Sequence, residues 1–302
     1  MVAIDKLSKT FDAGRIKAVD SVSLDIPQGE LFGLIGPDGA GKTTLFRMLT
    51  TLLLPDMGSA IVAGHDIVAD YKKIRNEVGY MPGKFSLYQD LTVEENLNFF
   101  ATLFGTTIQE NYHLIRDIYV QIEPFKQRRA GKLSGGMKQK LALCCALIHK
   151  PRVLFLDEPT TGVDPVSRKE FWEMLKRLKQ QGITILVSTP YMDEATLCDR
   201  VALIQSGKIM AVDTPSGIIS EYPGKLYAVR STEIPRLLSD VRLFENMLSC
   251  FSFGQLLHVS FRSDHAYATE ELRRFLVSKG HQEVDIREQT PGIEDCFIRL
   301  LK

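Results

Sequence analysis

The stretch Gly36-Pro37-Asp38-Gly39-Ala40-Gly41-Lys42-Thr43 matches the phosphate-binding pattern G-x-x-x-x-G-K-[ST] at every fixed position. A short apolar run, 31–35, leads into it, and residues 44–54 follow with helical spacing up to Pro55. Glycines let backbone N–H groups converge on phosphate oxygens, Lys42 is expected to reach the β- and γ-phosphates, and Thr43 to ligate Mg²⁺. The strand before and the helix after disfavour a chance glycine turn. We therefore predict a P-loop fold that binds a nucleoside triphosphate.

Two carboxylates end a second apolar strand, 153–156. Ligands bind at the carboxyl ends of strands in open α/β sheets, so Asp157 and Glu158 are expected at the nucleotide. Asp157 is predicted to hold Mg²⁺, directly or through water, and Glu158 to orient and deprotonate the attacking water. The alternative is a polar strand end without chemistry.

A third motif, Leu133-Ser134-Gly135-Gly136-Met137-Lys138-Gln139, reads as the start of a helix. Ser134 is suited to cap this helix, and two glycines leave its first N–H groups unobstructed. Free N–H groups and the helix dipole together favour an anion. Taken alone the motif is more often only a cap. Its meaning comes from its place between the other two motifs.

These three motifs, in this order, resemble the ATP-binding cassette (ABC) family, whose ATPase subunits drive transporters. The resemblance covers about residues 1–220. It implies an α/β fold, the P-loop NTPase ABC cassette, with a RecA-like parallel sheet core, an antiparallel β subdomain and a helical subdomain at about 90–150. It also implies that ATP is sandwiched between two cassettes, with the third motif gripping the γ-phosphate bound by the other one.

The resemblance also assigns softer contacts. Phe11 is expected to stack on adenine, and the alternative is an ordinary core aromatic. Asp164 is expected to lie in the D-loop that communicates across the dimer, and the alternative is an exposed turn aspartate before Pro165. Asp38 replaces the family's usual Asn and is expected to point away from phosphate and stabilise the turn. The predicted nucleotide contacts are Phe11, Gly36, Pro37, Asp38, Gly39, Ala40, Gly41, Lys42, Thr43 and Thr44, and the predicted trans-ATP contacts are Leu133, Ser134, Gly135, Gly136, Met137, Lys138 and Gln139.

Two positions depart from the family pattern. Gly83 stands where the family has a Gln that touches Mg²⁺ and the attacking water, and Pro190 stands where it has a His that contacts the γ-phosphate. Proline has neither a side-chain donor nor a backbone N–H. Losing such a donor costs about a hundred- to a thousandfold in rate, so we expect ATP to bind here but to be hydrolysed slowly. A heterodimer with one weak site is favoured over a homodimer, unless Thr189, Tyr191 or Lys84 supplies the missing contact.

Two domains are expected, a cassette at 1–222 and a small C-terminal α+β domain at 225–302. The first eighty residues read as strands with a single helix. Residues 93–123 read as helix with Leu97, Phe100, Ala101 and Phe104 on one face, and 191–198 as a further helix. The tail should run strand, helix, two strands, helix (268–278), strand (283–287) and helix (293–301).

The last of these helices carries Pro291-Gly292-Ile293-Glu294-Asp295-Cys296-Phe297, which resembles the P-x-L-E-D-x-F ending of ATPase subunits from bacterial ABC-2-type exporters. Tyr191-Met192-Asp193-Glu194-Ala195 resembles that group too. The alternative for the tail is an amphipathic helix that seals the small domain. The resemblance implies the ATPase subunit of an export-type transporter, cytoplasmic and peripheral on the inner face of a bacterial cell membrane, with ATP and Mg²⁺ as cofactors and an ABC-2-type permease and a second cassette as partners.

Composition bears on the rival functions. Thirty-seven basic residues balance 37 acidic ones, and the sequence has no sustained heptads, so nucleic acid is not an expected partner and a soluble ABC protein acting on ribosomes or DNA is disfavoured. The five cysteines lack C-x-x-C spacing and are expected to be reduced and buried. The first residues predict no signal peptide, and no apolar run reaches about 18 residues, so a pore, if the protein serves a membrane process, is expected from another chain. A regulatory ATP sensor without turnover stays open because of Gly83 and Pro190.

Overall fold

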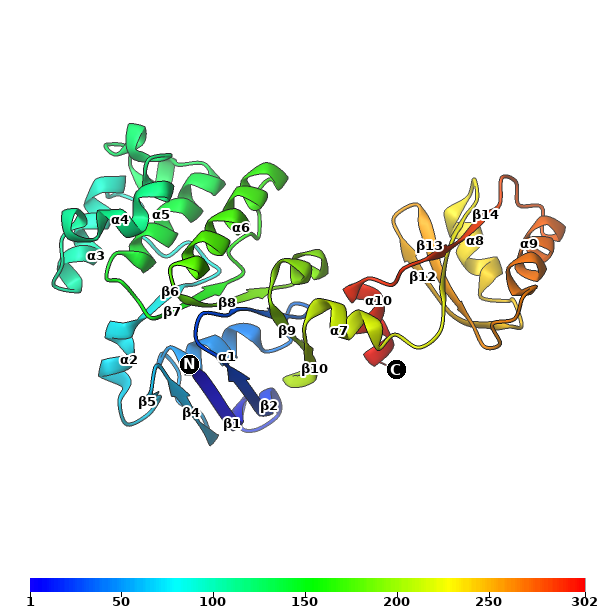
Figure 1. Ribbon diagram of the computed structural model, residues 1–302, viewed down its shortest axis with the longest axis horizontal. Coiled ribbons are helices and arrows are strands. Elements are labelled where there is room, and N and C mark those ends of the chain that lie inside the picture. The colour runs from blue at the N-terminus through cyan, green and yellow to red at the C-terminus, as the bar shows by residue number, and fades with distance from the viewer. Residues whose placement is uncertain (302) are drawn as a thin grey trace. The chain divides into compact units, whose positions relative to one another are not determined.

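The computed structural model describes residues 1–301, which divide into two compact units at Ile218 and Ile219. The first unit is built on a six-stranded sheet of order β10-β9-β3-β8-β7-β6 (Figure 1). All neighbours in it run parallel except β10, which is antiparallel to β9. The strands are β3 (Leu31–Ile35), β6 (Val78–Met81), β7 (Val153–Asp157), β8 (Thr184–Thr189), β9 (Arg200–Gln205) and β10 (Lys208–Asp213). β3 and β7 are buried along their whole length, as continuous apolar runs in a covered parallel sheet should be.

A second, antiparallel sheet of order β2-β1-β4-β5 belongs to the same unit. Its strands are β1 (Val2–Phe11), β2 (Ile16–Ile26), β4 (Met57–Val62) and β5 (His65–Asp66). The end of β2 alternates buried Val22, Leu24 and Ile26 with exposed residues, which is typical of a half-covered antiparallel strand. These side chains share one core cluster with Phe46 of α1 (Lys42–Leu49) and Phe155 of β7, so α1 is enclosed between the two sheets.

Helices α3 (Val93–Leu103), α4 (Ile108–Tyr119) and α5 (Gly135–Leu147) gather on the other side of the parallel sheet (Figure 1). Thr92 and Thr107 each begin a helix with a capping box, so the helical stretch expected over 93–123 contains two separate helices, α3 and α4. The first unit also contains α2 (Tyr71–Glu77), α6 (Pro165–Gln180) and the 3₁₀ turns Glu123–Phe125, Ala130–Lys132 and Met192–Leu197, and α7 (Pro215–Ser220) spans the division between the units.

Three sequence expectations were wrong in detail. The helix expected over 44–54 ends at Leu49, and α2 is a second helix within the first eighty residues. The helix expected over 191–198 is a 3₁₀ turn, Met192–Leu197. Pro190 lies before this turn, and the acidic residues Asp193 and Glu194 lie within it. Short polar segments of this kind give little periodicity to read.

The second unit holds a four-stranded antiparallel sheet of order β12-β13-β11-β14. Its elements are β11 (Leu226–Arg230), α8 (Ile234–Val241), β12 (Met247–Phe253), β13 (Leu256–Phe261), α9 (Ala268–Ser278), β14 (Asp285–Gln289) and α10 (Ile293–Leu300). This is the order that the sequence predicts, and Leu237, Leu272 and Val259 belong to its own core. Within residues 1–301, no helix combines the length and the apolar character that crossing a bilayer takes.

Candidate functional site

The phosphate-binding loop joins β3 to α1, where the sequence places it. Gly41 precedes the helix with φ of 105°, a conformation that L side chains rarely adopt. Gly36 is needed for a different reason, since a Cβ there would lie 2.2 Å from the carbonyl oxygen of Ile204. The two glycines therefore fix the loop against its neighbours and leave its N–H groups uncovered.

Lys42 is the buried cation of this loop, with 3% of its surface exposed. Its Nζ donates to the carbonyl oxygens of Gly36, at 2.8 Å, and Pro37, at 3.0 Å. The same Nζ lies 3.2 Å from Oε1 of Glu158. The structure thus brings together the lysine and the carboxylate that the sequence assigned to phosphate binding and to proton transfer.

The carboxylates reach this loop because β8 lies between β3 and β7 in the sheet. Ser188 of β8 pairs with Asp157, and its Oγ donates to Oδ1 of Asp157 at 2.6 Å. The N–H of Glu158 donates to the carbonyl oxygen of Ser188 at 3.0 Å, while Glu158 itself has a left-handed φ of 49°. Sequence reasoning missed Ser188, since a single serine in an apolar strand gives no signal until the register is known.

A hollow of about 370 Å³ lies over the loop. It is lined by Ala18, Asp38, Gly39, Ala40, Gly41, Lys42, Thr43, Thr44 and Glu158. Asp38 is exposed at its rim, and the hydrogen bonds of residues 1–301 include none from its side chain to the turn, so the predicted turn-stabilising contact is not made. The donor set of one buried cation and uncovered N–H groups suits a polyanion.

The predicted trans-ATP motif, Leu133–Gln139, is a separate surface. Ser134 is exposed and caps α5, its Oγ accepting from the N–H of Met137 at 3.4 Å. None of these seven residues lines the hollow beside Lys42 within the described chain. The contact of this motif with a nucleotide bound by another cassette stays a prediction.

Two softer assignments have clear surroundings. Phe11 is 41% exposed at the end of β1, so it is not the ordinary core aromatic of the alternative. Asp164 caps α6 by accepting from the N–H groups of Val166, at 3.1 Å, and Ser167, at 3.0 Å. The hydrogen bond from Ser167 is the largest cause that lowers the pKa of this carboxyl. Stacking on adenine and communication across a dimer both stay predictions.

The two departures from the family pattern lie beside the carboxylates. A Cβ on Gly83 would lie 3.1 Å from the carbonyl oxygen of Asp157, and Pro190 directly follows Thr189, whose carbonyl accepts from the N–H of Gly36 at 3.2 Å. Gly83 therefore lies against Asp157, and Pro190 follows the strand end that contacts the phosphate-binding loop. Thr189 is fully buried and its hydroxyl donates to Glu194, at 2.6 Å, so it is not free to replace the histidine, whereas Lys84 is exposed.

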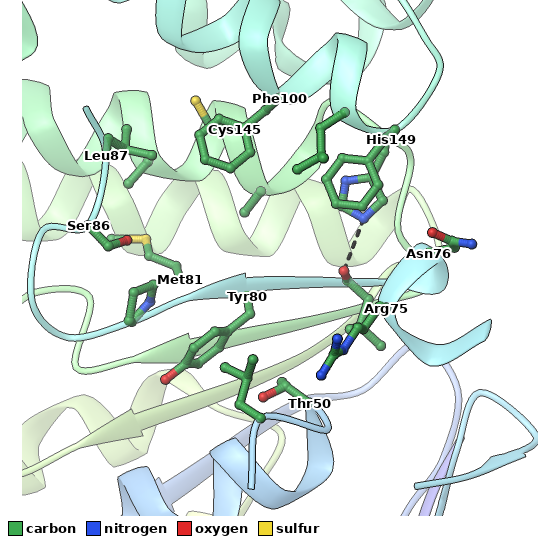
Figure 2. Close-up of a pocket in the computed structure, with 17 residues that line it drawn as sticks. Thr50, Arg75, Asn76, Tyr80, Met81, Ser86, Leu87, Phe100, Cys145 and His149 are labelled. Carbon is green, nitrogen blue, oxygen red and sulfur yellow. Dashed lines mark hydrogen bonds between the residues drawn. The ribbon is translucent and has the colours of Figure 1, made fainter. Parts of the chain in front are cut away.

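A second hollow, of about 560 Å³, lies between β6, the end of α1 and the helices α2, α3 and α5 (Figure 2). Its wall is mostly apolar and includes Met81, Leu87, Phe100 and Phe104. His149 stacks on Phe104, with ring centroids 3.9 Å apart, and its Nε2 lies 3.0 Å from the carbonyl oxygen of Val78. Burial lowers the pKa of His149, so its neutral form is favoured in this groove. We call this hollow the helical groove.

Comparison with known proteins identifies relatives of this chain. The family model described as "ABC transporter" matches residues 19–161. The chain is 39% identical over its full length to the probable multidrug ABC transporter ATP-binding protein YbhF of Escherichia coli K12, of which it spans about half, 52%. It is 34% identical to the Nod factor export ATP-binding protein I of Rhizobium sp. N33, with 99% of this chain and 97% of that protein covered.

A solved structure described as the ATP-binding subunit of an ABC transporter superposes with a TM-score of 0.67. It is 27% identical and covers 73% of this chain and 92% of its own length. The order of the three motifs, the sheet that brings Lys42 to Glu158 and these similarities agree with one another. The chain belongs to the ATP-binding proteins of the ABC transporter family.

Proposed function

We propose that this chain is the ATPase subunit that energises a separate ABC-2-type membrane permease for export, from the inner face of a bacterial cell membrane. The observation that carries the proposal is the buried Lys42, 3.2 Å from Glu158 over an open phosphate-binding loop. Among the relatives, the Nod factor export protein supports the direction of transport, and the probable multidrug transporter protein supports a transport role. The resemblance of the tail, Pro291–Phe297, to ABC-2-type subunits supports the class of permease.

The residues of the hollow suit ATP with Mg²⁺. No group of three or more His, Cys, Asp and Glu side chains within residues 1–301 is arranged to hold a metal ion. Thr43 and the carboxylate of Asp157 would hold Mg²⁺ together with phosphate oxygens, which is the usual manner for this ion. Bound Mg²⁺ would neutralise charge on the phosphates. Lys42 binds the β- and γ-phosphates, and Glu158 takes the proton of the water that attacks the γ-phosphorus as the bond to the β–γ bridging oxygen breaks.

Hydrolysis at this site is proposed to be slow. Pro190 offers no donor toward the γ-phosphate, and Gly83 offers no side chain toward the attacking water. Thr189, which was a candidate replacement, is committed to Glu194. The exposed helix start at Ser134 would complete a faster site on a different cassette, which favours a heterodimer closed around ATP.

The experiment that tests the proposal is Mg²⁺-ATP hydrolysis by the purified chain over a wide range of protein concentration, with Glu158→Gln as the blank. Turnover equal to the blank, with ATP binding intact, is the expected result for a chain that needs a second cassette. Turnover that rises steeply with concentration would show a self-sufficient homodimer. Absence of ATP binding would overturn the proposal, and binding without turnover in any pairing would identify a regulatory subunit.

The permease is proposed to dock in the helical groove. Its apolar wall is continuous with exposed side chains on its rim, Leu52 (55%) and Leu103 (62%), and Arg75 adds a cation. An amphipathic segment from the cytoplasmic side of a permease fits this combination. Leu103→Ala and Phe100→Ala together should weaken association with permease-containing membranes, measured by co-sedimentation. Val120→Ala, an exposed apolar residue that does not line the groove, serves as the control. Unchanged association of the double variant would contradict this docking site.

A further inference from the structure

Glu194 is a buried carboxylate that the proposed chemistry does not use. It lies in the 3₁₀ turn Met192–Leu197, and only 1% of it is exposed. A buried carboxylate is strongly unfavourable unless hydrogen bonds and opposite charge compensate it. The contacts that compensate this one therefore show what it holds.

Three segments supply those contacts. The hydroxyl of Thr160 donates to Oε1 of Glu194 at 2.7 Å, and the hydroxyl of Thr189 donates to Oε2 at 2.6 Å. Arg168 of α6 places its Nε 3.6 Å from Oε1. Thr160 and Thr189 are themselves buried, with 1% and 0% exposed. We call these four residues the Glu194 cluster.

Two of these three segments, those of Thr160 and Thr189, adjoin the predicted catalytic residues. Thr160 follows Glu158 by two residues and leads into the loop that ends at Asp164. Thr189 is the last residue of β8 and immediately precedes Pro190. The hydroxyl oxygen of Thr189 also accepts from the N–H of Tyr191 at 3.1 Å. The guanidinium of Arg168 lies 4.2 Å from the centre of the Tyr191 ring. One carboxylate thus ties the segment after Glu158 to the strand end that precedes Pro190.

We propose that Glu194 is a positioning residue for ATP hydrolysis. By holding Thr160 and Thr189 at once, it fixes the distance between the segment that carries Glu158 and the strand end that carries Pro190. This alignment matters more here than where a histidine contacts the phosphate directly, because Pro190 cannot be pulled into place by a contact of its own. The proposal rests on the ATPase function proposed above. The competing explanation is that the cluster stabilises only its own turn.

Turnover separates the two explanations. In Glu194→Ala, kcat should fall about 10- to 100-fold, because small displacements of reacting groups have effects of that size, while the KM for ATP stays within about twofold. Glu194→Gln should recover most of the loss, since an amide can accept from one threonine and donate to the other. Glu173→Ala, an exposed glutamate of α6, is the matched control. Wild-type kcat in Glu194→Ala would overturn the proposal and leave the ATPase function standing.

Hydrogen exchange gives a readout that does not depend on activity. Thr160→Val should speed amide exchange in residues 191–198, which Thr160 reaches through Glu194, and Glu194→Ala should speed exchange in 158–164. Thr161→Val, at the exposed neighbour, is the control for Thr160. Changes confined to the substituted segment would overturn the proposal. Hydrogen exchange tests the role of Glu194 even if wild-type turnover is no higher than that of Glu158→Gln. If the chain binds no ATP but exchange in the two segments changes together, the ATPase function is contradicted and the role of Glu194 in joining them is not.

Discussion

At the scale of single residues, Pro190 offers the sharpest prediction. Pro190→His restores a donor at the end of β8, beside Gly36 and Asp157, and should raise kcat by about a hundredfold, the amount that one transition-state donor typically contributes. The measurement is phosphate release under steady-state conditions. Pro190→Ala is the control, because it removes the proline ring without adding a donor. An unchanged or lower kcat in the histidine variant would contradict the slow-site proposal.

His149 carries a prediction about pH. Its pKa is lowered from the ordinary value of 6.5 because burial disfavours the charged form. Below pH 6.5, His149 is protonated more readily in the unfolded chain than in the folded chain. The free energy of unfolding should therefore decrease as the pH falls below 6.5. Urea unfolding at pH 7.5 and 5.5 measures this for the wild type and for His149→Gln. Equal pH dependence in both would show that His149 does not contribute.

Residues differ in how far the sequence reveals them. The phosphate loop, Asp157 and Glu158 could be predicted because motif and flanking strands point to one arrangement. Ser188 and the pair of Thr160 and Glu194 could not, since Ser188 bonds Asp157 across 31 positions and Thr160 bonds Glu194 across 34, and only the folded sheet brings these partners together.

At the scale of elements, the closing helix α10 shows what the tail motif does in the fold. Its buried residues include Ile293, Cys296 and Phe297, as expected of a sealing helix. Asp295 accepts from the N–H of Gly292 at 2.8 Å and lies 2.7 Å from Nδ1 of His258 on β13. The alternative that the sequence left open, a helix that closes the small unit, is therefore supported. The link to ABC-2-type exporters stays a prediction.

Asp295→Ala should destabilise the second unit by about 2–3 kcal/mol, since it removes a helix cap and a hydrogen-bonded buried charge. Urea unfolding followed by circular dichroism measures the change, while the fluorescence of Trp172, the one tryptophan of the chain, reports on the first unit. Glu294→Ala, at the exposed neighbouring position, should have little effect. A wild-type unfolding curve for Asp295→Ala would show that the motif is not structural.

Element boundaries were harder to predict than element types. The helix α1 ends at Leu49, before the proline that the sequence suggested as its limit. Thr50 caps it there, and the exposed and half-exposed leucines 52–54 continue the apolar run in the loop. The break between α3 and α4 rests on the cap at Thr107, which a search for apolar periodicity overlooks.

At the scale of the whole molecule, all five cysteines are buried and unpaired. Burial raises the pKa of every one, to about 11 for Cys250 and Cys296 and further for Cys144, Cys145 and Cys198. Few thiolates therefore exist at pH 8, so the thiols of the native chain should react with Ellman's reagent far more slowly than those of the chain in urea. In urea, all five thiols should react. Stability should also decrease as the pH rises above 9.0, the ordinary value for these thiols. A fast equivalent in the native chain would contradict this assignment.

The occupancy of the Lys42 ammonium has a consequence for measuring affinity. An ammonium group has three protons, and here three oxygens, from Gly36, Pro37 and Glu158, stand within reach of them. An incoming phosphate must compete for one of these places, and the half-buried Glu158 carboxylate is the partner able to move aside. The apparent affinity for nucleotide then reflects the free energy of the pair between Lys42 and phosphate minus that of the pair between Lys42 and Glu158. Replacing Glu158 with an uncharged side chain removes this competitor. The dissociation constant for nucleotide measured on Glu158→Gln should therefore be smaller than that of the native chain, and binding data from this variant overstate the affinity of the native cassette.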